Sequence, residues 1–230
     1  MDYLYLLLNL GSFFVPFLFS FHPKLKFYKL WIPLFMSITI TMLLFIPWDV
    51  IFTKYGIWGF NNAYFLDYKL LFLPIEEWLF FVCIPYACVF THYALIYYFP
   101  DKTLSIPFTR ILSYIFIFFL GILAIINYDK WYTVINFSFA FILISIVLVS
   151  NIKILSKFYL TFLVMLIPFF LVNGILTGSI IENEVVWYND NENLGIRLFT
   201  IPIEDTIYAF SLILMNLFLL EKFKKPKIND

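Results

Sequence analysis

Seven apolar stretches, each about as long as a membrane is thick, divide the 230 residues of this chain. A helix needs about 20 mostly apolar residues to cross the hydrocarbon core of a bilayer. Within that core every backbone N–H and C=O must be hydrogen-bonded inside the protein, so stretches of this length indicate helices. The chain is also 63% hydrophobic and only 13% charged, against about 25% charged in a typical soluble domain. We therefore predict an all-α polytopic membrane protein with seven transmembrane helices, at residues 3–21, 29–48, 72–98, 107–127, 131–150, 155–176 and 200–221.

The first stretch has the position of a secretory signal peptide but not its other features. It has no basic region in front of the apolar residues and no cleavage site made of small residues. Its nearest lysines, Lys24, Lys26 and Lys29, follow the apolar residues instead. We therefore expect it to be retained as a transmembrane helix.

The charged residues are divided unequally between the two sides that seven helices create. Eleven of the 15 Lys and Arg residues fall on the side of the C-terminal tail, and twelve of the 15 acidic residues fall on the opposite side. Loops rich in Lys and Arg remain in the cytoplasm. The distribution predicts a multi-pass protein of the cell membrane with its N-terminus outside and its C-terminus in the cytoplasm.

Several classes of function are disfavoured by what the sequence contains. The formal net charge is +0, which gives no reason to expect a nucleic acid as partner. The 7 glycines form neither a dinucleotide-binding nor a phosphate-binding loop, and the two histidines have no second ligand at a metal-binding spacing. We expect no cofactor and no metal.

An internal repeat is the main organising feature of the chain. Pro74-Ile75-Glu76-Glu77 returns as Pro202-Ile203-Glu204-Asp205, 128 residues later, and each follows an aromatic loop, "GIWGFNN" or "VVWYND". Three helices followed by one connecting helix bring the second unit into the same orientation as the first, so the two repeats are parallel. The predicted division is a first repeat at 1–100, a connecting helix at 101–130, a second repeat at 131–224 and a cytoplasmic tail at 225–230.

The two acid pairs, Glu76 with Glu77 and Glu204 with Asp205, are the main candidates for chemistry. Proline is favoured at the start of a helix, which places each pair in a first turn at the positive end of the helix dipole. The simplest alternative is a charged helix cap at the membrane surface. Matched pairs at one depth favour a function, because ionisable groups in membranes are costly. A protonated carboxyl beside an ionised one can supply a general acid and a base.

Other polar residues are candidates for supporting roles in the same site. Trp48 and Asp49 are predicted to close the second helix, and Asn173 to lie near the outer end of the sixth. Each has an ordinary alternative, either at the membrane surface or at a helix end. Arg197 could pair with one of the acids, Tyr208 lies one helical turn after Glu204, and Asn62 lies in the first long loop.

The sequence resembles a known family in four segments. "PWDVIFTKYGIWGF", "PIEEWLFF", "NGILTG" and "GIRLFTIPIEDTIYAF" are similar to segments of the membrane lycopene cyclases of the heterodimeric type found in bacteria, archaea and fungi, in a fused two-repeat form. The resemblance covers nearly the whole chain. It implies that Glu76, Glu77, Glu204 and Asp205 are the catalytic acids and that Trp48, Asp49, Asn173 and Thr177 belong to the same site. The acidic loop between the sixth and seventh helices departs from the family pattern.

The resemblance implies an isomerisation, the cyclisation of the linear ends of lycopene to rings of the β-ionone type. The product is γ-carotene or β-carotene, no net oxidation occurs, and no cofactor is needed. Lycopene or another linear carotene would be the substrate and would enter from the bilayer, and other carotenoid enzymes are possible partners. We expect Glu76 or Glu204 to donate the proton and the other acids to tune it or to act as base. Two alternatives stay open, a proton-coupled transporter and a non-catalytic partner of another carotenoid enzyme.

Overall fold

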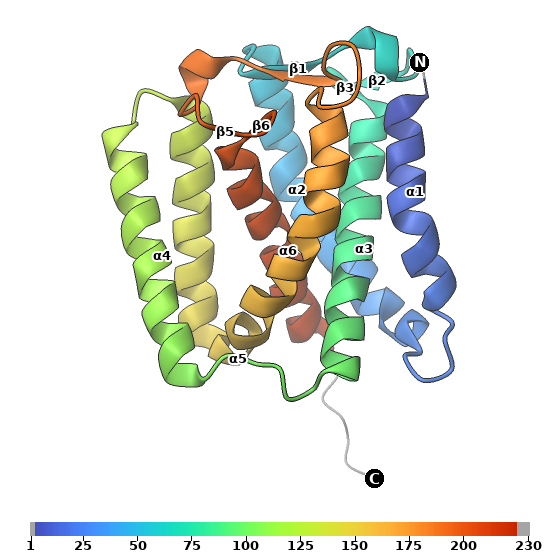
Figure 1. Ribbon diagram of the computed structural model, residues 1–230, viewed down its shortest axis with the longest axis vertical. Coiled ribbons are helices and arrows are strands. Elements are labelled where there is room, and N and C mark those ends of the chain that lie inside the picture. Colours follow the sequence, from blue (N-terminus) through green and yellow to red (C-terminus); the bar gives the residue numbers. More distant parts are fainter. Residues whose placement is uncertain (1–2, 225–230) are drawn as a thin grey trace.

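Six helices make up most of the protein, whose computed structural model describes residues 3–224 (Figure 1). They run roughly side by side, and short links join them at the end near the C-terminus (Figure 1). The predicted tail at 225–230 lies outside the described residues. A short 3-10 helix, Phe27–Leu30, precedes α2. The helices are α1 Leu4–Phe19, α2 Trp31–Lys54, α3 Ile75–Tyr98, α4 Ile106–Ile126, α5 Trp131–Leu176 and α6 Ile203–Phe223.

The longest helix, α5, consists of two helical segments that run in opposite directions (Figure 1). A straight helix of its 46 residues would be about 69 Å long, more than twice the thickness of the hydrocarbon core. The backbone leaves the helical conformation at Asn151, with φ −159° and ψ 80°. The fifth and sixth predicted stretches are therefore the descending and ascending segments of α5.

The predicted all-α membrane fold is confirmed. Five helices, α2 to α6, are long and apolar enough to cross a membrane. The sixth, α1, has 16 residues and is shorter than the usual spanning length of about 20 residues. Large apolar side chains are exposed along α4, including Phe118, Phe119 and Ile125. Exposed apolar surface of this extent is suited to contact with lipid rather than water.

Helix α2 continues six residues beyond the predicted end at residue 48. Asp49, which we expected to close the helix at the outer surface, instead lies inside it and is buried. The cause is tertiary, since Phe52 near the end of α2 is buried and packs against Trp58 in the loop that follows. This packing extends the helix and turns Asp49 into the protein.

Short strands, absent from the sequence prediction, organise the end of the molecule that carries the acids (Figure 1). β1 (Trp58–Phe60) pairs antiparallel with β4 (Val186–Tyr188) and so joins the two long loops. Two small hairpins precede the acid-bearing helices, β2 (Lys69–Leu70) with β3 (Leu73–Pro74) and β5 (Arg197–Leu198) with β6 (Ile201–Pro202). Strands of two or three residues have no period that a sequence pattern can detect.

The two halves of the chain make the same contacts around their acid-bearing helices. The backbone N–H of Ile75 donates to the carbonyl of Tyr68, and 128 positions later Ile203 donates to Ile196. The amide of Asn9 donates to the backbone carbonyl of Glu76 at 2.8 Å, as that of Asn136 does to Glu204 at 2.7 Å. Both acid-bearing helices begin at the same end of the molecule (Figure 1).

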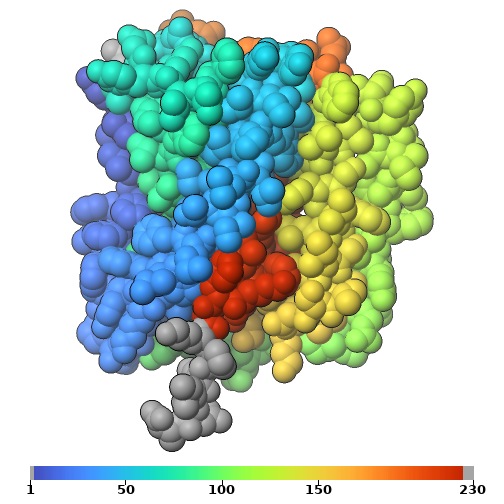
Figure 2. All heavy atoms as spheres, turned by 180° about the vertical axis from the view of Figure 1, so that it is seen from behind, coloured from blue at the N-terminus to red at the C-terminus, as the bar shows by residue number. Residues whose placement is uncertain are grey.

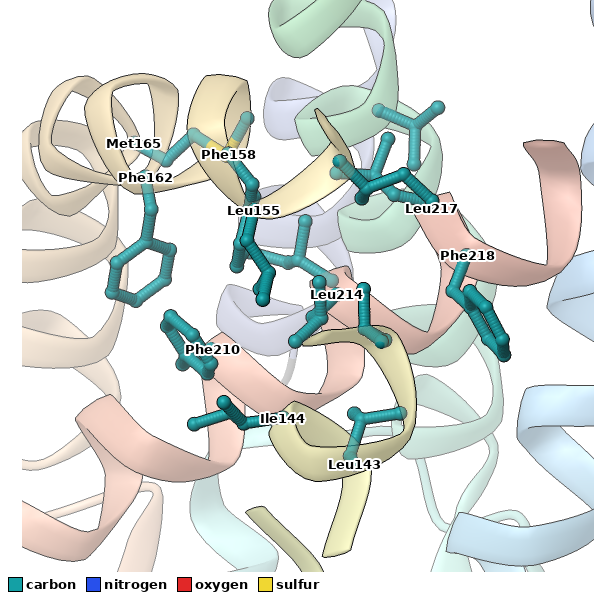
Figure 3. Packing of buried hydrophobic residues seen from close by; sticks show 14 of the residues in the cluster. Leu143, Ile144, Leu155, Phe158, Phe162, Met165, Phe210, Leu214, Leu217 and Phe218 are labelled. Atoms are coloured by element: carbon teal, nitrogen blue, oxygen red, sulfur yellow. The ribbon is translucent and has the colours of Figure 1, made fainter. Parts of the chain in front are cut away.

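The main apolar core lies where the two segments of α5 meet α6. Figure 3 shows Leu143 and Ile144 of the first segment and Leu155 and Phe158 of the second around Leu214 of α6. From behind, α6 reaches the surface in a narrow band between α2 and α5 (Figure 2). Packing on several sides fixes the rotation of α6 about its axis, and therefore which of its first-turn acids faces inward.

Candidate active site

A cavity of about 240 Å³ lies between α1, α3, α6 and the second segment of α5. Three carboxyl groups line its upper end, those of Asp49, Glu77 and Asp205. The lower part is almost entirely apolar, because α3 turns one stripe of side chains toward it at helical spacing. This stripe consists of Glu77, Phe80, Ile84, Ala87, Cys88 and Thr91.

Glu77 and Asp49 form a pair of buried carboxyl groups. Both side chains line the same end of the cavity. Each also accepts a hydrogen bond from one tyrosine: Tyr5 of α1 donates to Glu77, and Tyr208 of α6 donates to Asp49 at 2.9 Å. The first half of the chain thus contributes two acids to the cavity, from α2 and α3.

Asp205 has three hydrogen-bond donors and no carboxyl partner of this kind. Tyr132 donates to one of its oxygens at 2.5 Å. Tyr188 and Asn173 donate to the other at 2.9 and 3.0 Å. These three donors fix the position of both carboxyl oxygens of Asp205.

Tyr188, in strand β4, holds its proton firmly. Burial, followed by the charge of the neighbouring Asp205, raises the pKa of Tyr188 well above its ordinary value. Its ring stacks on that of Tyr132 with centroids 5.8 Å apart. Tyr188 therefore acts as a fixed hydrogen-bond donor to Asp205.

Glu76 and Glu204 are buried but do not line the cavity. One oxygen of Glu76 accepts a hydrogen bond from the backbone N–H of Leu66 at 2.8 Å. Glu204 accepts the equivalent bond from Leu194, also at 2.8 Å, and a second from Thr133 at 2.6 Å. Both side chains tie a long loop to the start of a helix. The expectation that one of them donates the proton is revised in the proposal below.

Replacing Glu204 by Ala is expected to destabilise the protein. The backbone N–H of Leu194 and the hydroxyl of Thr133 would lose their acceptor, and each buried donor left unpaired costs about 1–3 kcal/mol. The measurement is the thermal midpoint of the detergent-solubilised protein. The control is Glu184→Ala, which changes an exposed acid in the loop that contains Leu194 and should leave the thermal midpoint unchanged. Equal thermal midpoints for the two variants would contradict the role of Glu204 in holding the loop to the start of α6.

The remaining predicted residues divide between the cavity and the outer surface. Thr177 lines the cavity and exchanges a hydrogen bond of 2.7 Å with Thr200. Trp48 packs on the ring of Tyr208 at 5.1 Å without reaching the cavity lining. Asn62 is exposed and accepts a hydrogen bond from Lys69.

Arg197 does not pair with either acid of the second motif. Its guanidinium forms a salt bridge of 2.6 Å with Asp190 and donates to the carbonyl of Thr200. Both partners lie in the same loop, and the side chain points along the outer surface of the hairpin. No Lys, Arg or His lines the cavity among residues 3–224.

Apart from Tyr208, the aromatic wall of the site was not anticipated from the sequence. Tyr5 and Tyr132 occupy equivalent places, since Tyr5 donates a hydrogen bond to Glu77 and Tyr132 donates one to Asp205. Each tyrosine lies four residues before an asparagine, Asn9 or Asn136, whose amide donates to the backbone at the start of the same helix. A repeated Tyr-x-x-x-Asn pattern, "YLLLN" and "YTVIN", was the available signal. The other aromatic residues at this end of the cavity are Trp58, Phe60, Phe80, Tyr188 and Tyr208.

Comparison with known proteins identifies the family of the chain. The model of the lycopene cyclase family matches the chain twice, over residues 2–95 and 129–223. These two regions contain all three carboxyl groups of the cavity, and the unmatched residues between them correspond largely to α4. No curated protein and no solved structure matches the chain. The chain belongs to the lycopene cyclase family.

Proposed function

We propose that this protein closes rings at the ends of lycopene or a similarly linear carotene, without a cofactor. The observation that carries the proposal is the placement of three carboxyl groups at one end of a cavity that is otherwise apolar and aromatic. Such a cavity accepts a hydrocarbon, and its acids are the groups that a proton-initiated isomerisation needs. Membership of the lycopene cyclase family supports the choice of substrate.

The reaction requires one proton to be added and one to be removed. An acid protonates the terminal double bond of the carotene and leaves a tertiary carbocation. A nearby double bond of the same chain attacks that cation, which forms the ring bond and moves the positive charge into the ring. A base then removes a ring proton, and a double bond of the β-ionone type forms. The product has the same atoms as the substrate.

Glu77 and Asp205 are the acids that we place at this chemistry, with Asp49 beside Glu77. A carboxyl group buried away from water and from cations favours its neutral form, which is the form that donates a proton. Glu77 and Asp49 are buried in this way. The faces of the surrounding aromatic rings stabilise a passing cation.

The substrate would lie along α3 with one end at the acids. From Glu77 to Thr91 the cavity follows α3 for 14 residues, about 21 Å at the rise of an α-helix. Its volume of about 240 Å³ is below the roughly 300–1,000 Å³ of typical ligand pockets. We infer that it holds one end of the carotene, while the rest of the chain extends into the bilayer. Successive cyclisation of two ends gives γ-carotene and then β-carotene.

We further propose that the two matched regions are parallel repeats joined by α4, with the acid end on the outer side of the membrane. The matched hydrogen bonds 128 positions apart support the repeats. The excess of Lys and Arg in the loops at the opposite end supports the orientation.

The test is expression of the protein in a host that accumulates lycopene and has no cyclase of its own. We expect the red pigment to be replaced by γ-carotene and β-carotene, identified by chromatography and absorption. The empty vector is the control. Unchanged lycopene with the protein present in the membrane would reject the proposal, and would leave a proton-coupled transporter or a non-catalytic partner as the alternatives.

A further inference from the structure

The two halves of the chain differ at one pair of equivalent positions beside the acids. The backbone N–H of Ile57 donates to Phe52 at the end of α2, and that of Val185 donates to Leu176 at the end of α5. The two acceptor residues, Phe52 and Leu176, are 124 positions apart, and this separation aligns α2 with the second segment of α5. Asp49 then corresponds to Asn173, so an acid in the first half takes the place of an amide in the second.

The amide at this position determines the surroundings of Asp205. Asn173 can only donate through its nitrogen, and it does so to Asp205 at 3.0 Å. With the hydroxyls of Tyr132 and Tyr188, three donors converge on the two oxygens of Asp205. An ionised carboxyl group is an acceptor only. The contacts of Asp205 are those of a carboxylate that accepts a proton during the reaction.

The acid at the equivalent position gives Glu77 the opposite surroundings. Asp49 and Glu77 are both buried at the same end of one cavity, and no Lys, Arg or His among residues 3–224 lines it. Tyr5 and Tyr208 supply one hydrogen-bond donor to each member of the pair. Like charges held this close cannot both ionise readily, as in the paired carboxyls of aspartic proteases. The pair therefore keeps a proton inside the cavity.

We propose that Asp49 and Glu77 act together as the proton donor and that Asp205 is the base, so that the two halves of the protein have different catalytic roles. This assignment rests on the proposed cyclisation. In each turnover the pair gives one proton to the terminal double bond, and Asp205 receives one proton from the ring. The hydroxyls of Tyr5 and Tyr208 then hydrogen-bond the charge left on the pair. After product release Asp205 gives up its proton to water and the pair takes one up from water, which completes the cycle.

Deuterium labelling separates the donor from the base. Membranes containing the wild-type protein, Asp49→Asn or Asp205→Asn are supplied with lycopene in D₂O, and the pigments are analysed by mass spectrometry. Wild type should give rings that carry one deuterium each. Asp49→Asn should lower ring formation by about 100-fold or more and return lycopene without deuterium. Asp205→Asn should still protonate the substrate and give deuterium-bearing pigment, either labelled lycopene, a hydroxylated product or an isomeric ring.

The controls make each failure recognisable. Asp190→Asn is the same chemical change at an exposed acid and should behave as wild type. Immunoblots of the membranes check that each variant accumulates, and Glu77→Gln provides a second donor variant if Asp49→Asn does not fold. Wild-type membranes that form no ring would reject the proposed function itself. Unlabelled lycopene from Asp205→Asn, or a wild-type rate from Asp49→Asn, in the presence of an active wild type would overturn the division of roles.

Discussion

Replacing Glu77 by Gln is expected to leave a lycopene-accumulating host red. The side chain keeps its size and can still accept a hydrogen bond from Tyr5, but the amide has no proton of carboxylic acidity to give. General acid catalysis contributes about 10²–10⁴-fold, so ring formation should fall by at least that lower figure. The measurement is the yield of γ-carotene and β-carotene per amount of membrane protein.

The adjacent residue provides a matched control for this variant. Glu76→Gln makes the same change one position earlier on α3, at a side chain that holds Leu66 and does not line the cavity. We expect it to accumulate less protein but to keep most of its activity per molecule. The opposite pattern, with Glu77→Gln active and Glu76→Gln inactive, would show that the proton comes from Glu76.

Replacing Ala87 by Met is expected to block the cavity and to stop cyclisation without touching an acid. Ala87 lies on the cavity face of α3, about 15 Å below Glu77 at the rise of an α-helix. A methionine side chain would extend into a space of only about 240 Å³. The polyene could then no longer place its end at the carboxyl groups, and ring formation should fall by at least about tenfold.

In the second half of the protein, the position equivalent to Ala87 already carries a methionine. The residue equivalent to Ala87, 128 positions later, is Met215, and the residue equivalent to Ser12, 127 positions later, is Phe139. Both pack against the cluster of buried residues that includes Phe45, whose ring lies 5.2 Å from that of Phe139. In the second half, these larger side chains occupy the space that corresponds to the route past Ala87 and Ser12.

Met215→Ala is the matched control for Ala87→Met. The change removes side-chain volume where Met215 packs on α6 and should cost about 2–5 kcal/mol of stability because of the space it leaves. The route past Ala87 stays open. Pigment yield per folded molecule should remain near wild type. Full β-carotene production by Ala87→Met would show that the carotene does not pass this part of α3.

Much of the fold followed from the length and composition of the apolar stretches. All seven predicted helical segments are present, because hydrocarbon leaves a chain few other ways to satisfy its backbone. The proline before each acid pair correctly indicated a helix start, at Ile75 and Ile203. The pairing of β1 with β4 could not be predicted, since it depends on contacts between residues more than 120 positions apart.

The site was predicted at the level of motifs and revised at the level of residues. The sequence pointed to both acid pairs but not to the member of each pair that faces the cavity. Consecutive residues on a helix point about 100° apart, so only the rotation of α3 and α6 in the bundle can decide between them. Arg197 pairs with Asp190 of its own loop and not with Glu204 or Asp205, a choice that the sequence left open.

The sequence by itself determined that this chain crosses a membrane with two similar acid-bearing halves, because hydrophobic length and a repeated motif are local properties. The tertiary structure decided how those halves differ. It turned Glu77 and Asp205 into one cavity, brought Asp49 of an extended α2 to the same cavity, and placed Asn173 against Asp205. The physical reason is that the protonation of a carboxyl group depends on its neighbours in space, and these neighbours come from four different helices.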